Sequence, residues 1–156
     1  METASRTLRW LLLGGWFGSW ALFALSVAPL SFRVLPNAEV AGALISPLLR
    51  TLHLYGLFAG LALFAIAFAS RQARSLQVLP LVLAGLCAVT EFGLTAAITD
   101  IRPSTFGTDT PEGAAARFAQ LHLMSRGLFA TILLGSGVLI GLHARADGAD
   151  PVEPGT

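Results

Sequence analysis

Charged side chains are scarce in this sequence, and lysine is absent altogether. Only 12% of the 156 residues are charged, all ten basic residues are arginine, and the formal net charge is +1. A water-soluble domain carries roughly 25% charged residues. A chain this poor in charge cannot cover a water-facing surface, which excludes an ordinary soluble domain. The near-neutral charge also argues against nucleic-acid binding, which needs a concentrated basic face.

Cysteine and the common catalytic motifs are also scarce. Cys87 is the single cysteine, so no disulfide forms within the chain. The sequence lacks a GxxxxGK(S/T) phosphate loop, a GxSxG nucleophile turn and a His-Glu-x-x-His motif. Its Cys, His and Asp residues show no zinc-ligand spacing. We therefore expect neither an enzyme nor a metal site.

Apolar residues make up 54% of the chain and gather in four long runs. The predicted spans are residues 10–31, 52–70, 76–99 and 119–143. Each is long enough to cross roughly 30 Å of hydrocarbon at about 1.5 Å per residue. The sequence therefore predicts an all-α, polytopic membrane protein whose four transmembrane helices form an antiparallel bundle in a lipid bilayer. Residues 1–146 form its single domain.

Two of these helices are expected to begin before their apolar runs. Residues 38–51 show an apolar residue at every fourth position, which predicts an amphipathic lead-in with a kink near Pro47. Residues 111–118 form a second lead-in, capped by Asp109 or Thr110. The segment 147–156 is rich in Asp, Gly and Pro and is expected to be disordered.

Small residues at four-residue spacing occur in every span. The pairs are Gly14/Gly18, Gly56/Gly60, Gly93/Ala97 and Gly137/Gly141. In lipid, such residues let helix backbones approach closely, and this packing supplies much of the attraction between helices. The pairs predict a compact bundle, and one of these faces could equally join a second copy of the chain or another membrane protein.

Glu91 is the most informative polar residue because it lies inside the third apolar run. It stands eight positions before Thr99, roughly 12 Å into the span, and shares a helix face with Thr95. A carboxyl group at that depth must face the bundle, pair or stay protonated. If the fourth span begins near Phe118, Arg126 lies at the same level, which predicts a Glu91–Arg126 ion pair.

Further polar residues are expected at the same membrane edge. The predicted site contains Glu91, Arg126, His122, Ser125 and Thr95, with Arg50 and His53 as contributors. One interpretation is a structural ion pair that fixes helix rotation, since buried polar groups must be satisfied in any case. The other is a functional polar cavity open to the side of the first and third loops. Both interpretations stay open at this stage.

His53 and His122 raise the question of a haem, because two histidines on different helices can ligate its iron. Such a site needs both side chains to face one cavity at matched depth, whereas His53 begins its span. A b-type haem protein is therefore the least favoured alternative, and we expect no cofactor.

Arginine distribution gives only a slight preference for orientation. The side bearing both termini carries Arg6, Arg9, Arg71, Arg74 and Arg145, and the other carries Arg33, Arg50, Arg102 and Arg117. The excess of positive charge predicts cytoplasmic termini. We expect the protein to lie in a bacterial inner membrane.

Two motifs resemble a known family. Residues 27–36 contain Ala-Pro-x-x-Phe-x-x-Leu-Pro and are followed by the pair Ala41-Gly42. Residues 118–125 read Phe-x-x-Leu-His-x-x-Ser. In this order, and with Arg102-Pro103 after the third span, they resemble the domain of unknown function 4149, whose animal members are named transmembrane protein 205. The resemblance covers nearly the whole chain and implies a four-helix integral membrane protein without an established reaction.

Together these observations predict a membrane protein without enzymatic activity that handles a small solute, a proton or a lipid at its polar edge. The alternative is a structural or assembly subunit that docks another membrane protein through its glycine-lined faces.

Overall fold

The computed structural model describes residues 2–106 and 112–148. Within them the chain is helical and contains no strand. The elements are α1 (Glu2–Leu22), η1 (Phe23–Val27), α2 (Ala28–Val34), α3 (Ala38–Ala69), α4 (Arg74–Val89), η2 (Thr90–Thr95), α5 (Ala96–Phe106) and α6 (Ala114–Gly148). The two η segments are π-helical turns, so the chain forms four long helical rods.

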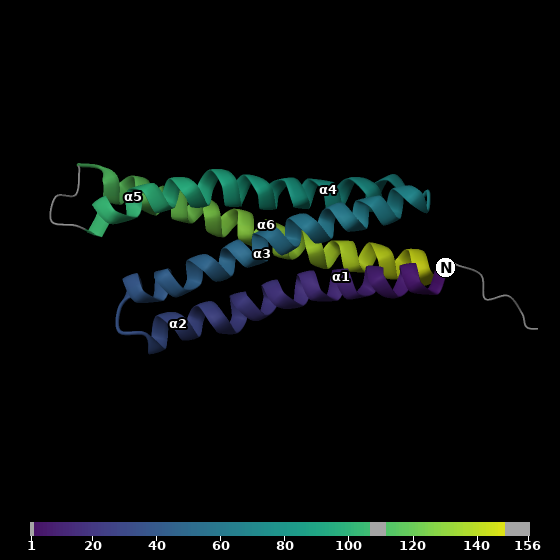
Figure 1. Cartoon of the computed structure of the whole chain (residues 1–156), viewed down its shortest axis with the longest axis horizontal. Helices are drawn as coiled ribbons and strands as arrows, with labels where there is room; N and C mark the ends of the chain where they lie inside the picture. Colours follow the sequence, from purple (N-terminus) through teal and green to yellow (C-terminus); the bar gives the residue numbers. More distant parts are fainter. Residues whose placement is uncertain (1, 107–111, 149–156) are drawn as a thin grey trace, which may run out of the picture.

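The four rods pack side by side and alternate in direction (Figure 1). The N-terminal end of α1 lies beside the C-terminal end of α6, so the first and last described residues lie at one end of the bundle, called here the terminus-bearing end (Figure 1). Close backbone contacts join α1 to α3, α3 to α4, α4 to α6 and α6 to α1. The rods therefore form a closed ring in the order α1, α3, α4, α6.

Each rod is long and apolar enough to cross a membrane. The four candidate spans are Thr3–Val34, Ala38–Ala69, Arg74–Ile101 and Ala114–Gly148. These helices contain the four apolar runs identified in the sequence, which confirms the all-α fold of a multi-pass membrane protein. The helices extend well beyond their apolar runs.

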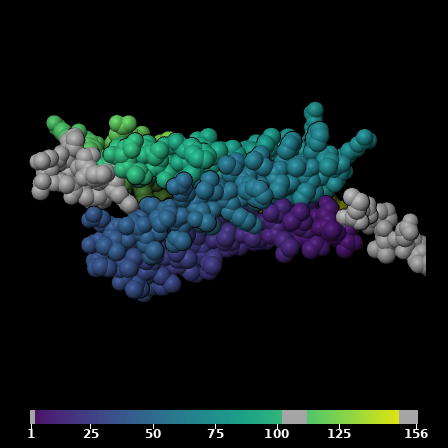
Figure 2. Space-filling view, viewed as in Figure 1, coloured from purple at the N-terminus to yellow at the C-terminus, as the bar shows by residue number. Residues whose placement is uncertain are grey.

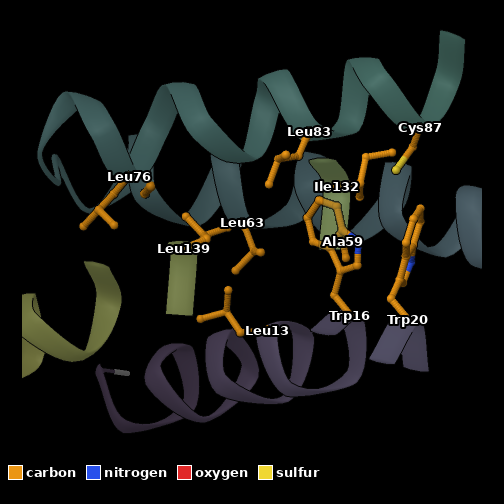
Figure 3. Close-up of a cluster of buried hydrophobic side chains, with 11 residues drawn as sticks. Leu13, Trp16, Trp20, Ala59, Leu63, Leu76, Leu83, Cys87, Ile132 and Leu139 are labelled. Atoms are coloured by element: carbon orange, nitrogen blue, oxygen red, sulfur yellow. The ribbon is translucent and has the colours of Figure 1, made fainter. Parts of the chain in front are cut away.

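A cluster of buried apolar side chains fills the middle of the bundle. Trp16 and Trp20 rise from α1 between the other helices, where they meet Leu63 of α3 and Ile132 of α6 (Figure 3). Both indoles are completely buried. Many outward-facing side chains are also apolar, including Leu25, Phe58 and Leu134. This distribution suits helices that pack against one another inside and against lipid outside.

Of the glycine pairs, Gly56/Gly60 is the one that brings helices together most closely. A Cβ atom added to Gly60 would lie 2.7 Å from the carbonyl oxygen of Pro80, and one added to Gly56 would lie 2.7 Å from Cys87 Sγ. A larger residue at either position would therefore push α3 away from α4. Around Gly14, Gly18, Gly93 and Gly141, in contrast, no atom of the described residues lies within reach of an added Cβ.

Helix α3 begins at Ala38, before its apolar run, and the expected lead-in is its first part. Asn37 caps the helix by accepting a hydrogen bond from the Val40 backbone N–H at 2.9 Å. From there α3 continues without interruption to Ala69, with Pro47 inside it. The residues expected as an amphipathic lead-in therefore form the first half of the second rod.

The ends of α6 differ from the sequence prediction. Its helix begins at Ala114, while Asp109, Thr110 and Pro111 lie outside the described residues. At the other end, Asp147 and Gly148 belong to the helix, so the expectation of disorder was wrong for these two residues. An ion pair with α1 holds Asp147 in place, as described below. Residues 149–156 lie outside the described part of the chain.

At the end opposite the termini, the bundle separates into two arms. Helix α2 packs on α3 and α5 packs on α6, but among the described residues no Cα atom of α5 comes within 8 Å of α2 or α3. The last segment that contacts both α3 and α6 is η2. The molecular surface is indented between the arms, with α6 visible between them (Figure 2).

Candidate functional site

The candidate site lies where the two arms meet, and its centre is Glu91. This residue is the second of η2 and is buried. Its Oε2 lies 3.2 Å from Nδ1 of His53, and its Oε1 lies 3.6 Å from Nε of Arg50. Both partners belong to α3, one turn apart, so the site spans the interface between α3 and the third rod.

The predicted Glu91–Arg126 ion pair is wrong. Arg126 is exposed on α6, and no ion pair joins it to Glu91. Counting residues from the membrane edge fixes the depth of a side chain but not its direction. Glu91 has antiparallel neighbours on both sides, and the π-helical turn that begins at Thr90 breaks the regular i+4 face assumed in the prediction. Glu91 therefore meets α3 instead of α6.

His53 is the most enclosed member of the site. Its side chain is 1% exposed, and its ring forms a T-shaped contact with Trp20, with ring centroids 5.5 Å apart. Trp20 in turn stacks on Phe129 of α6 at 4.5 Å. The imidazole thus lies between a carboxylate on one side and an aromatic wall on the other. Its Nε2 is buried and has no hydrogen-bond partner among the described residues.

Exposure decreases in steps through the site. The side chains of Arg50, Glu91 and His53 are 69%, 9% and 1% exposed, respectively. Because Arg50 is largely exposed, its pair with Glu91 adds little stability. The buried contact between Glu91 and His53 is electrostatically stronger because the surroundings are apolar. The three side chains therefore lead from the edge of the bundle to its core.

The other predicted site residues are less central. His122 is exposed on α6, and its ring stacks on Phe118 with centroids 5.8 Å apart. Ser125 and Thr95 are half-buried, and the backbone oxygen of Thr95 accepts a hydrogen bond from Thr99 Oγ1 at 2.8 Å. Of the predicted set, the structure brings Glu91 into direct contact with Arg50 and His53, the two residues that had been assigned only contributing roles.

The arrangement does not fit a haem between His53 and His122. The imidazole of His53 is enclosed and its Nδ1 contacts Glu91, whereas the side chain of His122 lies at the surface. The two rings therefore do not face one cavity, as axial ligation would require. Within the described residues there is also no group of three or more His, Cys, Asp or Glu side chains placed to hold a metal ion.

A second polar cluster, at the terminus-bearing end, was missed from the sequence. It consists of Arg6, Arg9 and Trp10 on α1 with His143 and Asp147 on α6. His143 is the last residue of the fourth apolar run, and its side chain is buried. The i+4 spacing of His143 and Asp147, on a rod antiparallel to an arginine-rich helix start, is the signal that could have revealed the cluster.

Comparison of the chain with protein-family models, with curated proteins and with solved structures finds no match. The fold and the site define the class: a helical bundle whose four rods are long and apolar enough to cross a membrane, with an ionisable cluster buried where its two arms meet. Membership of the domain of unknown function 4149 family stays a prediction from the two sequence motifs.

Proposed function

We propose that this chain is an integral membrane protein, without enzymatic activity, that takes up and releases a proton at the Arg50–Glu91–His53 cluster. The observation that carries the proposal is the contact between Glu91 and the fully enclosed imidazole of His53. Ionisable residues inside a membrane span are costly and usually belong to ion or proton pathways. Here two of them share one hydrogen bond, and the proton in it has two acceptors.

The graded exposure of the cluster supports access from the loop end. Arg50 lies at the surface of α3, Glu91 behind it and His53 in the core. The molecular surface is indented between the arms, and these arms meet at η2, the segment that contains Glu91 (Figure 2). A proton needs no cavity of its own, whereas a larger solute would have to displace Trp20, which contacts the ring of His53 and stacks on Phe129. A proton is therefore the cargo that this tightly packed site fits best.

Proton flux into proteoliposomes tests the proposal. With a potassium diffusion potential and a pH-sensitive dye inside the vesicles, the wild-type protein should acidify the lumen faster than empty liposomes. Glu91→Gln should reduce the flux to the level of empty liposomes, because the amide keeps a hydrogen bond to His53 but does not carry the proton. His53→Phe should have the same effect.

Arg126→Gln is the matched control, since it removes an exposed charge from α6, at the residue that the sequence predicted to pair with Glu91. It should leave the flux unchanged. Elution from a sizing column and the unfolding temperature of each variant verify its fold. Wild-type flux equal to that of empty liposomes, or undiminished flux in Glu91→Gln, would overturn the proposal.

We further propose that the protein lies in a bacterial inner membrane with both termini in the cytoplasm. The slight excess of arginine at the terminus-bearing end supports this orientation. Resemblance to the domain of unknown function 4149 family supports the membrane assignment and adds no reaction.

A second candidate function is that of an assembly subunit, and the outer face of α1 favours it. A Cβ atom added to Gly14 or Gly18 would have no neighbouring atom of the described residues within 4 Å, and the nearby Leu11 and Leu22 are exposed. Such a face suits close contact with another membrane helix. Affinity purification from native membranes tests this role. A stoichiometric partner that is lost in Gly18→Leu would support it, and a protein recovered alone would exclude it.

A further inference from the structure

The cluster at the terminus-bearing end is built around one carboxylate that is already satisfied. Asp147 contacts Arg9 Nη2 through Oδ1 at 2.5 Å and accepts a hydrogen bond from Trp10 Nε1 at 2.9 Å. Nε of Arg6 lies 3.2 Å from its Oδ2. With three donors on two oxygens, Asp147 needs no further partner. The arrangement ties α1 to α6 next to the two termini (Figure 1).

Other polar atoms of the same cluster are left without partners. Both ring nitrogens of His143 and the Nε atom of Arg9 are buried and make no hydrogen bond to any described residue. The residues themselves are 1% and 7% exposed. Buried polar groups in native proteins are nearly always bonded, so an orphaned set of this kind marks a missing partner. Arg9 Nε can only donate, and a neutral imidazole donates from one nitrogen.

The charge of the cluster shows what kind of partner it lacks. Arg6 and Arg9 contribute two positive charges and Asp147 one negative charge, which leaves a net charge of +1 with a neutral imidazole. A group with a single negative charge and several acceptor oxygens would balance this charge and accept the orphaned N–H groups. A phosphodiester has both properties, and arginine binds phosphate oxygens especially well.

The position of the cluster in the bundle indicates which molecule would supply the phosphodiester. It lies near the ends of two apolar rods, at the level where lipid headgroups meet a protein that spans a bilayer. Basic pockets between helices at this level bind anionic headgroups. Arg71, Arg74 and Arg145 belong to the same end and add to its positive field.

We propose that Arg9 and His143 form a binding site for the phosphate group of an anionic phospholipid, wedged between α1 and α6. Arg9 Nε and one ring nitrogen of His143 donate to the non-bridging oxygens, while Asp147 keeps Arg9 Nη2 and Trp10 Nε1 as donors. The Arg6 side chain is 59% exposed over the cluster and moves aside to admit the phosphate. This site is independent of the proton site at the opposite end of the bundle.

Thermal unfolding in lipid nanodiscs of defined composition tests the proposal. Nanodiscs of phosphatidylglycerol should raise the unfolding temperature of the wild type by about 3–6 °C over phosphatidylcholine, the shift expected for a ligand at about ten times its Kd. Phosphatidylcholine mixed with oleate, at the same surface charge, should not reproduce the rise, because a carboxylate lacks the phosphate geometry. Inorganic phosphate added to protein in detergent shows whether a free anion binds instead.

Three variants connect the shift to the cluster. His143→Phe removes the imidazole but leaves the ion pairs of Asp147 intact, and it should abolish the shift. Arg9→Gln should do the same while Arg6 and Trp10 still hold Asp147. Arg145→Gln, which removes an exposed charge from the same end of α6, should retain it.

A rise with phosphatidylglycerol alone supports the lipid site, and a rise with inorganic phosphate as well keeps the phosphate site but makes its source a free anion. Equal unfolding temperatures in the two phospholipids overturn the proposal. So does a shift that survives both His143→Phe and Arg9→Gln, or one that Arg145→Gln removes, since a diffuse charge effect would then explain it.

Discussion

Individual side chains in this protein are placed by partners on neighbouring helices as much as by their own helix. His53 and Glu91 lie on different rods and meet at 3.2 Å, and Arg9 of α1 meets Asp147 of α6 at 2.5 Å. None of these pairs is close in sequence. The residue types and their depths were readable from the sequence, because ionisable groups stand out in an apolar run. Their directions were not, because they depend on how each rod is rotated.

At the residue scale, Asp147→Ala tests how firmly α1 and α6 are tied together. The change leaves Arg9 buried without its counter-charge. We expect the free energy of unfolding to fall by about 2–3 kcal/mol. Breaking a fully buried ion pair costs about 3–5 kcal/mol. The expected loss is smaller here because Arg9 lies near the helix end and its guanidinium can reach water. Equilibrium unfolding in mixed micelles measures it.

Asp100→Ala is the control for that experiment, since Asp100 is an exposed aspartate of α5. It should change the unfolding free energy by no more than about 0.5 kcal/mol. If Asp147→Ala is equally harmless, the ion pairs of the terminus-bearing end contribute nothing to the stability of the bundle.

At the scale of elements, the positions of the four rods follow from hydropathy, but their internal irregularities follow only in part. Pro29 lacks a backbone N–H, and its ring would collide with the carbonyl four residues earlier in a regular α-helix. The π-helical turn over Phe23–Val27 provides room for it. The π-helical turn over Thr90–Thr95, in contrast, is not predicted by a proline in the sequence. Its presence changes which way Glu91 faces, and for this reason the predicted partner was wrong.

The close approach of α3 and α4 gives a prediction at the same scale. Gly60→Ala places a methyl group 2.7 Å from the backbone oxygen of Pro80, which cannot move without moving α4. We expect a loss of about 1–3 kcal/mol, the usual cost of overpacking a core. Gly14→Ala, whose added methyl group meets no described atom, should be neutral or slightly stabilising. Unfolding of both variants in the same micelles distinguishes internal from outward glycines.

At the scale of the whole molecule, the sequence predicted the antiparallel order of the rods, because short loops join helices of matching length. The separation of the loop end into two arms was not predictable from the sequence. It reflects the absence of close packing between α5 and the α2–α3 pair, and side-chain patterns of single helices do not reveal which pairs fail to meet. The sequence therefore predicted the depth of the polar site in the bundle, but not that it lies where the two arms meet.

The topology of the whole chain is testable by cysteine labelling. Cys87 is completely buried, so the native protein should not react with a membrane-impermeant maleimide. In intact spheroplasts of a bacterial host, Glu112→Cys at the loop end should be labelled, and Arg74→Cys at the terminus-bearing end should be labelled only after permeabilisation. The reverse pattern would invert the orientation. Labelling of both from the same side would show that the rods do not cross the membrane.

The division of the molecule into a closed half and a two-armed half also has a mechanical consequence. Where the four rods form a ring, each is braced by two neighbours, whereas beyond η2 each arm is a pair of helices braced on one side alone. The compliance of the protein is therefore unevenly distributed along its length. Lateral pressure from the surrounding lipid bends the two arms relative to each other. This bending is concentrated where the arms join the ring, next to the carboxylate of Glu91.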